Sequence, residues 1–314
     1  MEKVDISVVI PVFNASLNLK SLVGEIIETF KKNFKTYELI LVDDKSQDNS
    51  WDLITILCKE HNFIKGISLR KNVGQHNSLL AGLKYTSGKY IVTMDDDGQN
   101  SPECITVLVE EIKKGYDICY ANYLIKKHNF FRKLCSKFNN IFVTLLFNKP
   151  YDLYLTSFRI FSSDIKNEVI KNKSSSIYLD GLLISISSNI SKVSVEHQKR
   201  KYGKSNYSIY KLLNLWIQMA TGFSVAPLRL ASILGLFFSI VGFLMSIWLV
   251  FIRIPSSDVP MGWTSLIVAV LFLGGIQLVA LGAIGEYLGR TYLSVNNYPQ
   301  FSVSNILNIE KIKD

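Results

Sequence analysis

The sequence predicts an α/β fold, with a mainly parallel sheet covered by helices on both faces, followed by two transmembrane helices. Two observations indicate the sheet. Apolar runs of strand length alternate with segments of helical periodicity, and these runs are apolar throughout, as in strands buried on both faces. A third observation indicates the membrane, because residues 230–252 and 259–285 carry no charge and each run exceeds the about 20 residues that a spanning helix needs. Two buried core helices are the alternative for these runs.

The expected elements alternate along the chain. Strands are expected at residues 5–14, 38–44, 63–69, 90–94 and 116–122, and the helices between them at residues 19–30, 51–57, 74–85 and 103–114. A strand-like segment at residues 152–161 and a polar strand at residues 187–196 follow. About the last dozen residues are expected to be disordered.

Three consecutive acidic residues, Asp95, Asp96 and Asp97, follow the expected strand at residues 90–94. Adjacent carboxylates repel one another and raise one another's pKa, and a bound divalent cation removes that cost. Asp95, Asp97 and Gln99 alternate, so in an extended segment they point to one side. Mg²⁺ and Mn²⁺ prefer such oxygen ligands and share their remaining positions with substrate phosphates. These residues predict a metal–diphosphate site, with a solvated acidic turn before the next helix as the alternative.

Polar groups also follow the ends of other expected strands. Asp43 and Asp44 end the strand at residues 38–44, and the strand at 63–69 precedes a polar Arg-Lys-Asn segment at residues 70–72. The carboxyl ends of parallel strands meet at one edge of a sheet, where open α/β folds bind their ligands. One rim is therefore expected to offer groups for metal, ribose and phosphate together.

The net charge of +9 is unevenly distributed. The cations just before the first charge-free run are Lys199, Arg200, Lys201, Lys204, Lys211 and Arg229. The positive-inside rule therefore places both termini in the cytosol. An anionic membrane surface and anionic substrates explain the basic balance, whereas no basic stripe interleaved with aromatic residues follows the pattern of a known nucleic-acid-binding module. The four cysteines lack paired spacing, which indicates reduced structural thiols.

Two basic segments are candidates for membrane and phosphate contacts. Residues 130–147 alternate aromatic residues with cations such as Arg132, a pattern that suits a helix in the membrane interface or, alternatively, a solvated helix packed on the core. Residues 198–207 combine Gly203 with Arg200 and Lys204, which can neutralise phosphate. A juxtamembrane cluster of positive charge explains the second segment equally well.

These observations divide the chain into four parts. Residues 1–206 are expected to form the cytosolic α/β domain and residues 207–227 an amphipathic juxtamembrane helix. Residues 228–290 are expected to form a two-helix transmembrane hairpin, and residues 291–314 a cytosolic tail.

The motifs resemble family 2 glycosyltransferases with a GT-A fold. Within that group they resemble the membrane-bound polyprenyl-phosphate glycosyltransferases, relatives of dolichyl-phosphate mannose synthase that include the bacterial undecaprenyl-phosphate sugar transferases. The matching segments lie at residues 9–14, 42–50, 70–82, 94–103, 157–159, 200–205 and 285–290. The resemblance covers about residues 5–303, and the order of the motifs together with two terminal spans makes it specific.

The resemblance implies metal-dependent, inverting transfer of a sugar from a nucleotide-sugar, with uridine as the expected base, to a polyprenyl phosphate. The product would be a lipid-linked sugar for modifying cell-envelope glycans. It implies a multi-pass protein of the bacterial inner (cytoplasmic) membrane, with the catalytic domain in the cytosol and undecaprenyl phosphate as the expected acceptor. Mg²⁺ or Mn²⁺ is the implied cofactor.

Carried over residue by residue, the resemblance also implies a site. Donor-binding residues would be Pro11, Asp43, Asp44, Gln75, Asp95 and Asp96, and metal ligands would be Asp95, Asp97 and Gln99. Phosphate-binding residues would be Arg132, Arg159, Arg200, Lys204 and Ser205, and the catalytic candidates are Asp97 and Asp152. Three departures from the family pattern bear on these roles: Ala15 stands where an acid is usual, Gly98 stands where an apolar residue is usual, and Asp152 lies about one residue further from Arg159.

Two rival functions remain at this stage. A processive polysaccharide synthase needs a Gln-x-x-Arg-Trp motif and more spans, and residues 198–202 do not fit that motif. A non-catalytic membrane scaffold would be expected to have lost the acidic strand ends, yet Asp95 and Asp97 are present. The sequence determines neither the sugar nor the oligomeric state, so a homo-oligomer remains open.

Overall fold

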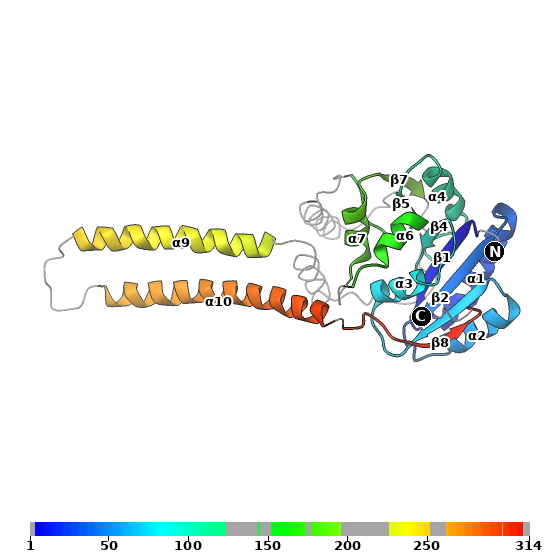
Figure 1. The fold of residues 1–314 in the computed structure, drawn as a ribbon, viewed down its shortest axis with the longest axis horizontal. Helices are drawn as coiled ribbons and strands as arrows, with labels where there is room; N and C mark the ends of the chain where they lie inside the picture. Colours follow the sequence, from blue (N-terminus) through cyan, green and yellow to red (C-terminus); the bar gives the residue numbers. More distant parts are fainter. Residues whose placement is uncertain are drawn as a thin grey trace. The chain divides into compact units, whose positions relative to one another are not determined.

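The computed structural model describes residues 4–123, 144, 152–173, 177–195, 226–251, 262–296 and 298–309. The chain divides into two compact units. The first consists of Met1–Ser208 and Asn297–Asp314, and the second of Ile209–Asn296. The first unit contains the sheet, and the second contains the two long helices that Figure 1 draws in yellow and orange.

The first unit begins with the predicted alternation of strands and helices. Its elements, in chain order, are β1 (Ile6–Val12), α1 (Ser16–Asn33), β2 (Tyr37–Asp43), α2 (Ser50–Glu60), β3 (Ile64–Leu69), α3 (Gln75–Leu83), β4 (Tyr90–Thr93), α4 (Cys104–Ile112) and β5 (Ile118–Tyr123). They continue with β6 (Arg159–Ser162), α6 (Ser163–Val169), α7 (Leu179–Ile186), β7 (Ile190–Val195) and β8 (Val303–Leu307).

The strands form one mixed sheet in the order β7-β5-β6-β4-β1-β2-β3-β8. Its centre is parallel, because β1 pairs with β2 and β4 and β2 pairs with β3, all in the same direction. Strand β6 runs antiparallel between β4 and β5, and β7 runs parallel to β5. The carboxyl ends of β1, β2, β3 and β4 therefore share one edge, where an open sheet binds ligands.

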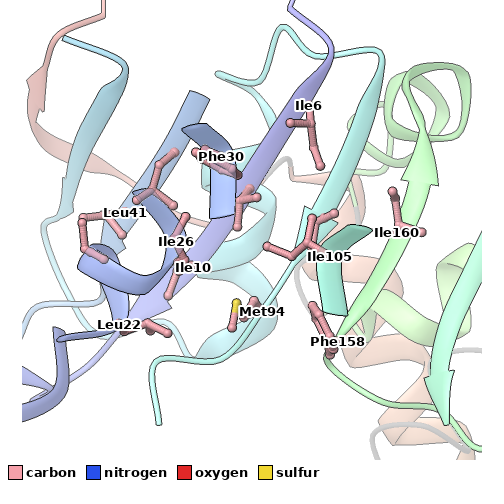
Figure 2. Packing of buried hydrophobic residues seen from close by; sticks show 14 of the residues in the cluster. Ile6, Ile10, Leu22, Ile26, Phe30, Leu41, Met94, Ile105, Phe158 and Ile160 are labelled. Atoms are coloured by element: carbon pink, nitrogen blue, oxygen red, sulfur yellow. The ribbon is translucent and has the colours of Figure 1, made fainter. Parts of the chain in front are cut away.

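The hydrophobic core lies between the sheet and the helices α1, α2 and α4. Figure 2 shows Leu22 and Ile26 of α1 together with Ile10 of β1 in this core. Ile105 of α4 and Phe158 belong to the same cluster, and all five are buried. Because strand side chains alternate between the two faces, neighbouring residues of β1 face the opposite layer.

Helix α3 packs on that opposite layer, and Gly82 makes the close contact possible. A Cβ atom at Gly82 would lie 2.5 Å from Val9 Cγ1 and 2.9 Å from Val42 Cγ2, closer than side chains tolerate. The glycine therefore lets the end of α3 approach β1 and β2, and it fixes the height of α3 over the sheet. The first residue of α3, Gln75, lies at the edge where the strands end.

Three differences from the predicted elements concern the later part of the unit. The segment at residues 152–161 is a strand only from Arg159 onward, because β6 begins there to pair with β4. Helices α6 and α7 were not predicted. The expectation that about the last dozen residues are disordered was wrong for the described residues 303–309, because β8 pairs antiparallel with β3 and covers its edge. Asn308 secures this strand by donating from Nδ2 to the carbonyls of Cys58 (2.6 Å) and Ile64 (2.8 Å).

The second unit contains α9 (Ala226–Phe251) and α10 (Trp263–Val295), which contact each other. Many of their apolar side chains are exposed, including Leu236, Phe243 and Leu281. Among the helices formed by the described residues, none combines the length and apolar character that crossing a membrane requires. The expected basic segments at residues 130–147 and 198–207 and the amphipathic helix at 207–227 lie outside the described residues, except for Thr144 and residues 226 and 227.

Candidate active site

The acidic strand ends lie side by side, as the sequence predicts. In the sheet register, Val12 of β1 pairs with Asp43 of β2, and Val9 of β1 pairs with Thr93 of β4. The residues that follow β1, β2 and β4 therefore meet at one rim. Pro11 is buried within β1, where it pairs with Val42.

Asp43 and Asp44 are buried and already bonded within the chain. Asp43 accepts hydrogen bonds from the Ser46 amide (3.1 Å) and the Ser68 hydroxyl (3.2 Å). Asp44 accepts from the backbone amides of Val73 (2.8 Å) and Gly74 (2.9 Å). Burial raises the pKa of Asp44, and the two amides oppose that rise. Asp44 therefore holds the loop between β3 and α3, and Asp43 holds the turn that follows β2.

Asp96 ties the acidic segment to the end of β1. Its Oδ2 accepts a hydrogen bond from the Phe13 amide at 3.1 Å. Burial raises the pKa of Asp96 to about 7, the Phe13 amide opposes that rise, and the charges of Asp95 and Asp97 add to it. In this arrangement Asp96 is bonded to the end of β1, and its two neighbours are the candidates for an outer ligand.

Asp95 is held from both sides by side chains of other elements. Gln75 Nε2, at the start of α3, donates to Asp95 Oδ1 at 2.6 Å. The Ser157 hydroxyl, just before β6, donates to Asp95 Oδ2 at 2.5 Å. An ionised carboxylate has about four acceptor positions, so it can accept these bonds and also bind a cation. The orientation of the Asp95 carboxylate is thus set by the protein before a cation binds.

Asp97 and Gln99 occupy a tight turn. Gly98 adopts φ +68°, a left-handed conformation that suits glycine, and the Gln99 amide donates to Asp97 Oδ1 at 3.0 Å. Within the described residues, no three His, Cys, Asp or Glu side chains are grouped to hold a metal. Mg²⁺, however, is typically bound by one or two carboxylates together with substrate phosphates and water. The donor set of Asp95 and Asp97 fits that kind of site.

Arg159 is buried beneath this rim, with an exposed fraction of 1%. Its guanidinium forms an ion pair with Asp180 of α7, and its Nε donates to Thr93 Oγ1 at 3.1 Å. Burial lowers the pKa of Arg159, but a guanidinium remains protonated at neutral pH. The structure therefore gives this predicted phosphate ligand an internal partner.

Of the five remaining predicted residues, the structure describes one, Asp152. Asp152 is exposed and forms an ion pair with Lys192 of β7. The other four predicted phosphate ligands, Arg132, Arg200, Lys204 and Ser205, lie outside the described residues.

Sequence reasoning missed three residues that contact the site. Ser157 lay within a recognised motif but was given no role, and neither His76 nor Asp180 was singled out. The Leu179 amide donates to His76 Nδ1 at 3.4 Å, which connects α7 to α3. Asp180 carried a signal, because it is an isolated acid in the otherwise apolar stretch at residues 177–183 and is buried. An isolated buried acid requires a partner.

Solved structures share this fold. Glucosyl-3-phosphoglycerate synthase from Mycobacterium tuberculosis, in complex with Mn²⁺, UDP and phosphoglyceric acid, matches with a TM-score of 0.52 and 18% identity over 69% of this chain and 76% of that one. The same enzyme with Mg²⁺ and UDP matches with a TM-score of 0.52 and 17% identity over 69% of this chain and 77% of that one. At this identity the likeness shows the fold alone, a GT-A fold.

Sequence relatives extend over nearly the whole chain. Undecaprenyl-phosphate 4-deoxy-4-formamido-L-arabinose transferase from Proteus mirabilis is 33% identical over 99% of this chain and 96% of its own. The enzyme of that name from Yersinia pestis is 32% identical over 98% of this chain and 95% of its own. The family model for glycosyl transferase family 2 matches residues 7–170, which include β1 to β6 and the acidic rim. The chain is a glycosyltransferase and belongs to glycosyl transferase family 2.

Proposed function

We propose that this glycosyltransferase transfers a sugar from a nucleotide-sugar, a UDP-sugar by preference, to undecaprenyl phosphate at the cytoplasmic face of the membrane. The observation that carries the proposal is the oriented pair Asp95 and Asp97 at the carboxyl edge of the sheet. Relatives that align with nearly the full chain are named for transfer to undecaprenyl phosphate, which supports this acceptor.

The proposed cofactor is Mg²⁺ or Mn²⁺, held by Asp95 and Asp97 with Gln99 beside them. When bound, such a cation neutralises charge on the leaving nucleoside diphosphate. The chain's own part is to present the two carboxylates at a fixed place. Gln75 and Ser157 hold the Asp95 carboxylate by hydrogen bonds, and the turn at Gly98 positions Asp97.

The proposed reaction is a single inverting displacement. An oxygen of the acceptor phosphate forms a bond to the anomeric carbon while the bond from that carbon to the nucleoside diphosphate breaks. A phosphate monoester is largely ionised near neutral pH, since its second pKa is about 6, so the reaction needs no strong general base. Asp152, which is exposed and paired with Lys192, accordingly has a proposed role in positioning rather than in proton removal.

The donor and acceptor are assigned to different sets of residues. Pro11, Asp43, Asp44 and Asp96 are proposed to shape the nucleotide pocket, the three acids through the loops that they hold. The proposed acceptor-phosphate ligands are Arg132, Arg200, Lys204 and Ser205. Cations and hydroxyls of this kind orient the acceptor for in-line attack.

We propose further, from the sequence rather than from the helices of the structure, that residues 228–290 form a membrane hairpin. The support is the absence of charge from residues 230–252 and 259–285 and the exposure of large apolar side chains such as Leu278 (71%) and Val279 (73%). Residues 1–206 are then the cytosolic catalytic domain, residues 207–227 a juxtamembrane helix, and residues 291–314 a cytosolic segment that contributes β8. A Ser256→Cys label in a cysteine-free background tests the orientation. Reaction with an impermeant maleimide from outside intact cells supports it, and reaction only after permeabilisation contradicts it.

A donor screen tests the proposed reaction. The full chain in detergent is incubated with Mn²⁺, undecaprenyl phosphate and a panel of UDP- and GDP-sugars that includes UDP-4-deoxy-4-formamido-L-arabinose, and release of the nucleoside diphosphate is followed. Release that requires the lipid from one donor supports the proposal and identifies the sugar. Release that is independent of lipid contradicts the acceptor, and no release from any donor favours a scaffold.

A further inference from the structure

Asp95 belongs to a closed ring of contacts that reaches from the rim into the core. The near half of the ring consists of the two bonds to its carboxylate, from Gln75 at 2.6 Å and from Ser157 at 2.5 Å. Each carboxylate oxygen thus accepts a hydrogen bond from a different part of the chain, so rotation of the carboxylate would break at least one of these two bonds. The orientation of Asp95 depends on where these two donors are held.

Ser157 is held from behind by a chain of buried groups. Thr93 Oγ1 donates to the Ser157 carbonyl at 2.7 Å, and Arg159 Nε donates to Thr93 Oγ1 at 3.1 Å. The guanidinium of Arg159 then pairs with Asp180. Thr93 and Arg159 are 0% and 1% exposed, so solvent does not compete for these contacts.

The far side of the ring returns to Gln75 through α7 and α3. Asp180 follows Leu179, whose amide donates to His76 Nδ1 at 3.4 Å, and His76 follows Gln75 in the chain. The rings of His76 and Tyr178 lie edge to face with centroids 5.0 Å apart. Burial, and then the charge of Arg159, lower the pKa of His76 to about 3, so the imidazole remains a neutral acceptor near pH 7.

We propose that Arg159 and Asp180 are positioning residues, which hold the Asp95 carboxylate in the orientation that binds a divalent cation. The inference rests on the proposed function, because it assumes a metal at Asp95. It differs from the role expected from sequence, in which Arg159 binds a substrate phosphate. The geometry favours positioning, since the guanidinium is buried and its bonds lead through Thr93 and Ser157 to Asp95.

A second buried ion pair provides a matched control. Glu38 and Lys65 pair at 2.6 Å near the starts of β2 and β3, at the edge of the sheet opposite the rim. Removing one partner of such a pair leaves an uncompensated charge, whereas replacing both partners is often tolerated. Double replacement therefore separates an effect on stability from an effect on the site.

The experiment compares the double variant Arg159→Met/Asp180→Asn with the control Lys65→Met/Glu38→Gln in the full chain. Mn²⁺ binding is measured with saturating UDP and no acceptor, together with the thermal midpoint. We expect the Kd for Mn²⁺ to rise about 10- to 100-fold in the first variant, the usual loss when a group that orients a metal ligand is removed. In the control we expect the midpoint to change and the Kd to stay the same.

The Mn²⁺ dependence of turnover supplies a second measurement, which would not change if the Arg159–Asp180 pair had only a structural role. In the Arg159→Met/Asp180→Asn variant, high Mn²⁺ concentration should restore kcat while KM for Mn²⁺ stays raised. An unchanged Kd for Mn²⁺ in this variant overturns the inference but leaves the proposed function intact. Absence of Mn²⁺ binding with UDP in the unmodified protein overturns both.

A less disruptive variant covers the case in which the double variant does not fold. Ser157→Ala removes one donor to Asp95 and leaves the buried ion pair in place. We expect it to raise the Kd for Mn²⁺ about 10-fold, and Ser157→Thr, which keeps the hydroxyl, to restore most of the affinity. A Ser157→Ala variant that binds Mn²⁺ as tightly as the unmodified protein contradicts the ring as the support of Asp95.

Discussion

The two edges of the sheet each contain a buried ion pair, and the two pairs have different surroundings. Glu38 and Lys65 pair where β2 and β3 begin. Glu38 also accepts hydrogen bonds from the Ser7 hydroxyl (2.5 Å) and from the Ser87 amide (2.6 Å). Arg159 and Asp180, where β4 ends, connect through Thr93 to the acidic rim. The chemistry of the pairs is alike, so their place in the sheet decides what they support. The pair at the amino edge stabilises the fold, whereas the pair at the carboxyl edge orients the Asp95 carboxylate.

The largest expected effect is at the carboxyl edge. Asp97→Asn should reduce transfer about 1,000-fold, because losing a metal ligand removes several kcal/mol of stabilisation from the transition state. Asp52→Asn, on the exposed side of α2, is the matched control and should leave transfer unchanged. Both variants should insert into membranes and unfold at the same temperature as the unmodified protein. Normal transfer by the Asp97→Asn variant with Mg²⁺ or Mn²⁺ present would refute the metal site.

The next effect is at the amino edge and should appear in stability alone. Glu38→Gln leaves the Lys65 charge without its partner, which costs about 3 kcal/mol because Glu38 is buried. This corresponds to a fall of roughly 10 °C in the thermal midpoint. Activity per folded molecule should not change. Glu60→Gln, which is exposed at the end of α2, is the control and should unfold normally.

The same carboxylate predicts a pH dependence. Burial alone would raise the pKa of Glu38, but hydrogen bonds from Lys65, Ser7 and Ser87 lower it below 4.5. A lowered pKa in the folded state stabilises the fold above the unfolded value and loses that contribution as pH falls through the folded value. The thermal midpoint should therefore decrease as the pH is lowered below about 4.5, and it should decrease less steeply in the Glu38→Gln variant. If the thermal midpoint decreases equally with pH in the unmodified protein and in the Glu38→Gln variant, other carboxylates control acid unfolding.

A third effect tests the layer between the two edges. Gly82→Ala places a Cβ 2.5 Å from Val9 Cγ1, and such overpacking costs about 2 kcal/mol. Gly24→Ala in α1 meets no atom within 4 Å and should stabilise the helix by about 0.5 kcal/mol. The sign of the change in unfolding free energy distinguishes the two. Equal effects would mean that α3 can shift away from the sheet.

The smallest effect concerns the attachment of β8. Asn308→Asp replaces the amide that donates to the carbonyls of Cys58 and Ile64, which should cost about 1 kcal/mol. Limited proteolysis should then remove the segment after residue 298 more rapidly. Asn305→Asp, exposed within β8, introduces the same charge and serves as the control. Identical proteolysis rates would show that the β3–β8 pairing alone holds the segment.

The sequence predicted the parts of the fold that depend on local pattern. Strands β1, β2 and β4 are apolar runs that are soon followed by Asn14, Asp44 and Asp95, so both the strands and their common edge were predictable. Strand β8 was not, because Val303–Leu307 is short and partly polar and becomes a strand through its pairing with β3. Edge strands depend on such partners more than on their own residues.

The same distinction applies to the site. The place of Asp95 and Asp97 at the strand edge was predictable, because they are adjacent acids directly after a buried strand. The support of Asp95 was not, because its contacts join residues that are far apart in the chain, such as Ser157 with Asp95 and Leu179 with His76. The sequence shows that Arg159 is an isolated cation, but only the fold shows that Asp180 is its partner.

The pairing of β8 with β3 has a consequence for biosynthesis. Chains emerge from the ribosome with the N-terminus first, and domains tend to fold as they emerge. Strand β3 is therefore made long before β8, and α9 and α10 are made in between. During that interval the nascent sheet has an open edge at β3, of the kind that pairs with other chains. A chain that terminates before Val303 would lack the partner of β3, and we expect its exposed edge to make the incomplete product prone to aggregation.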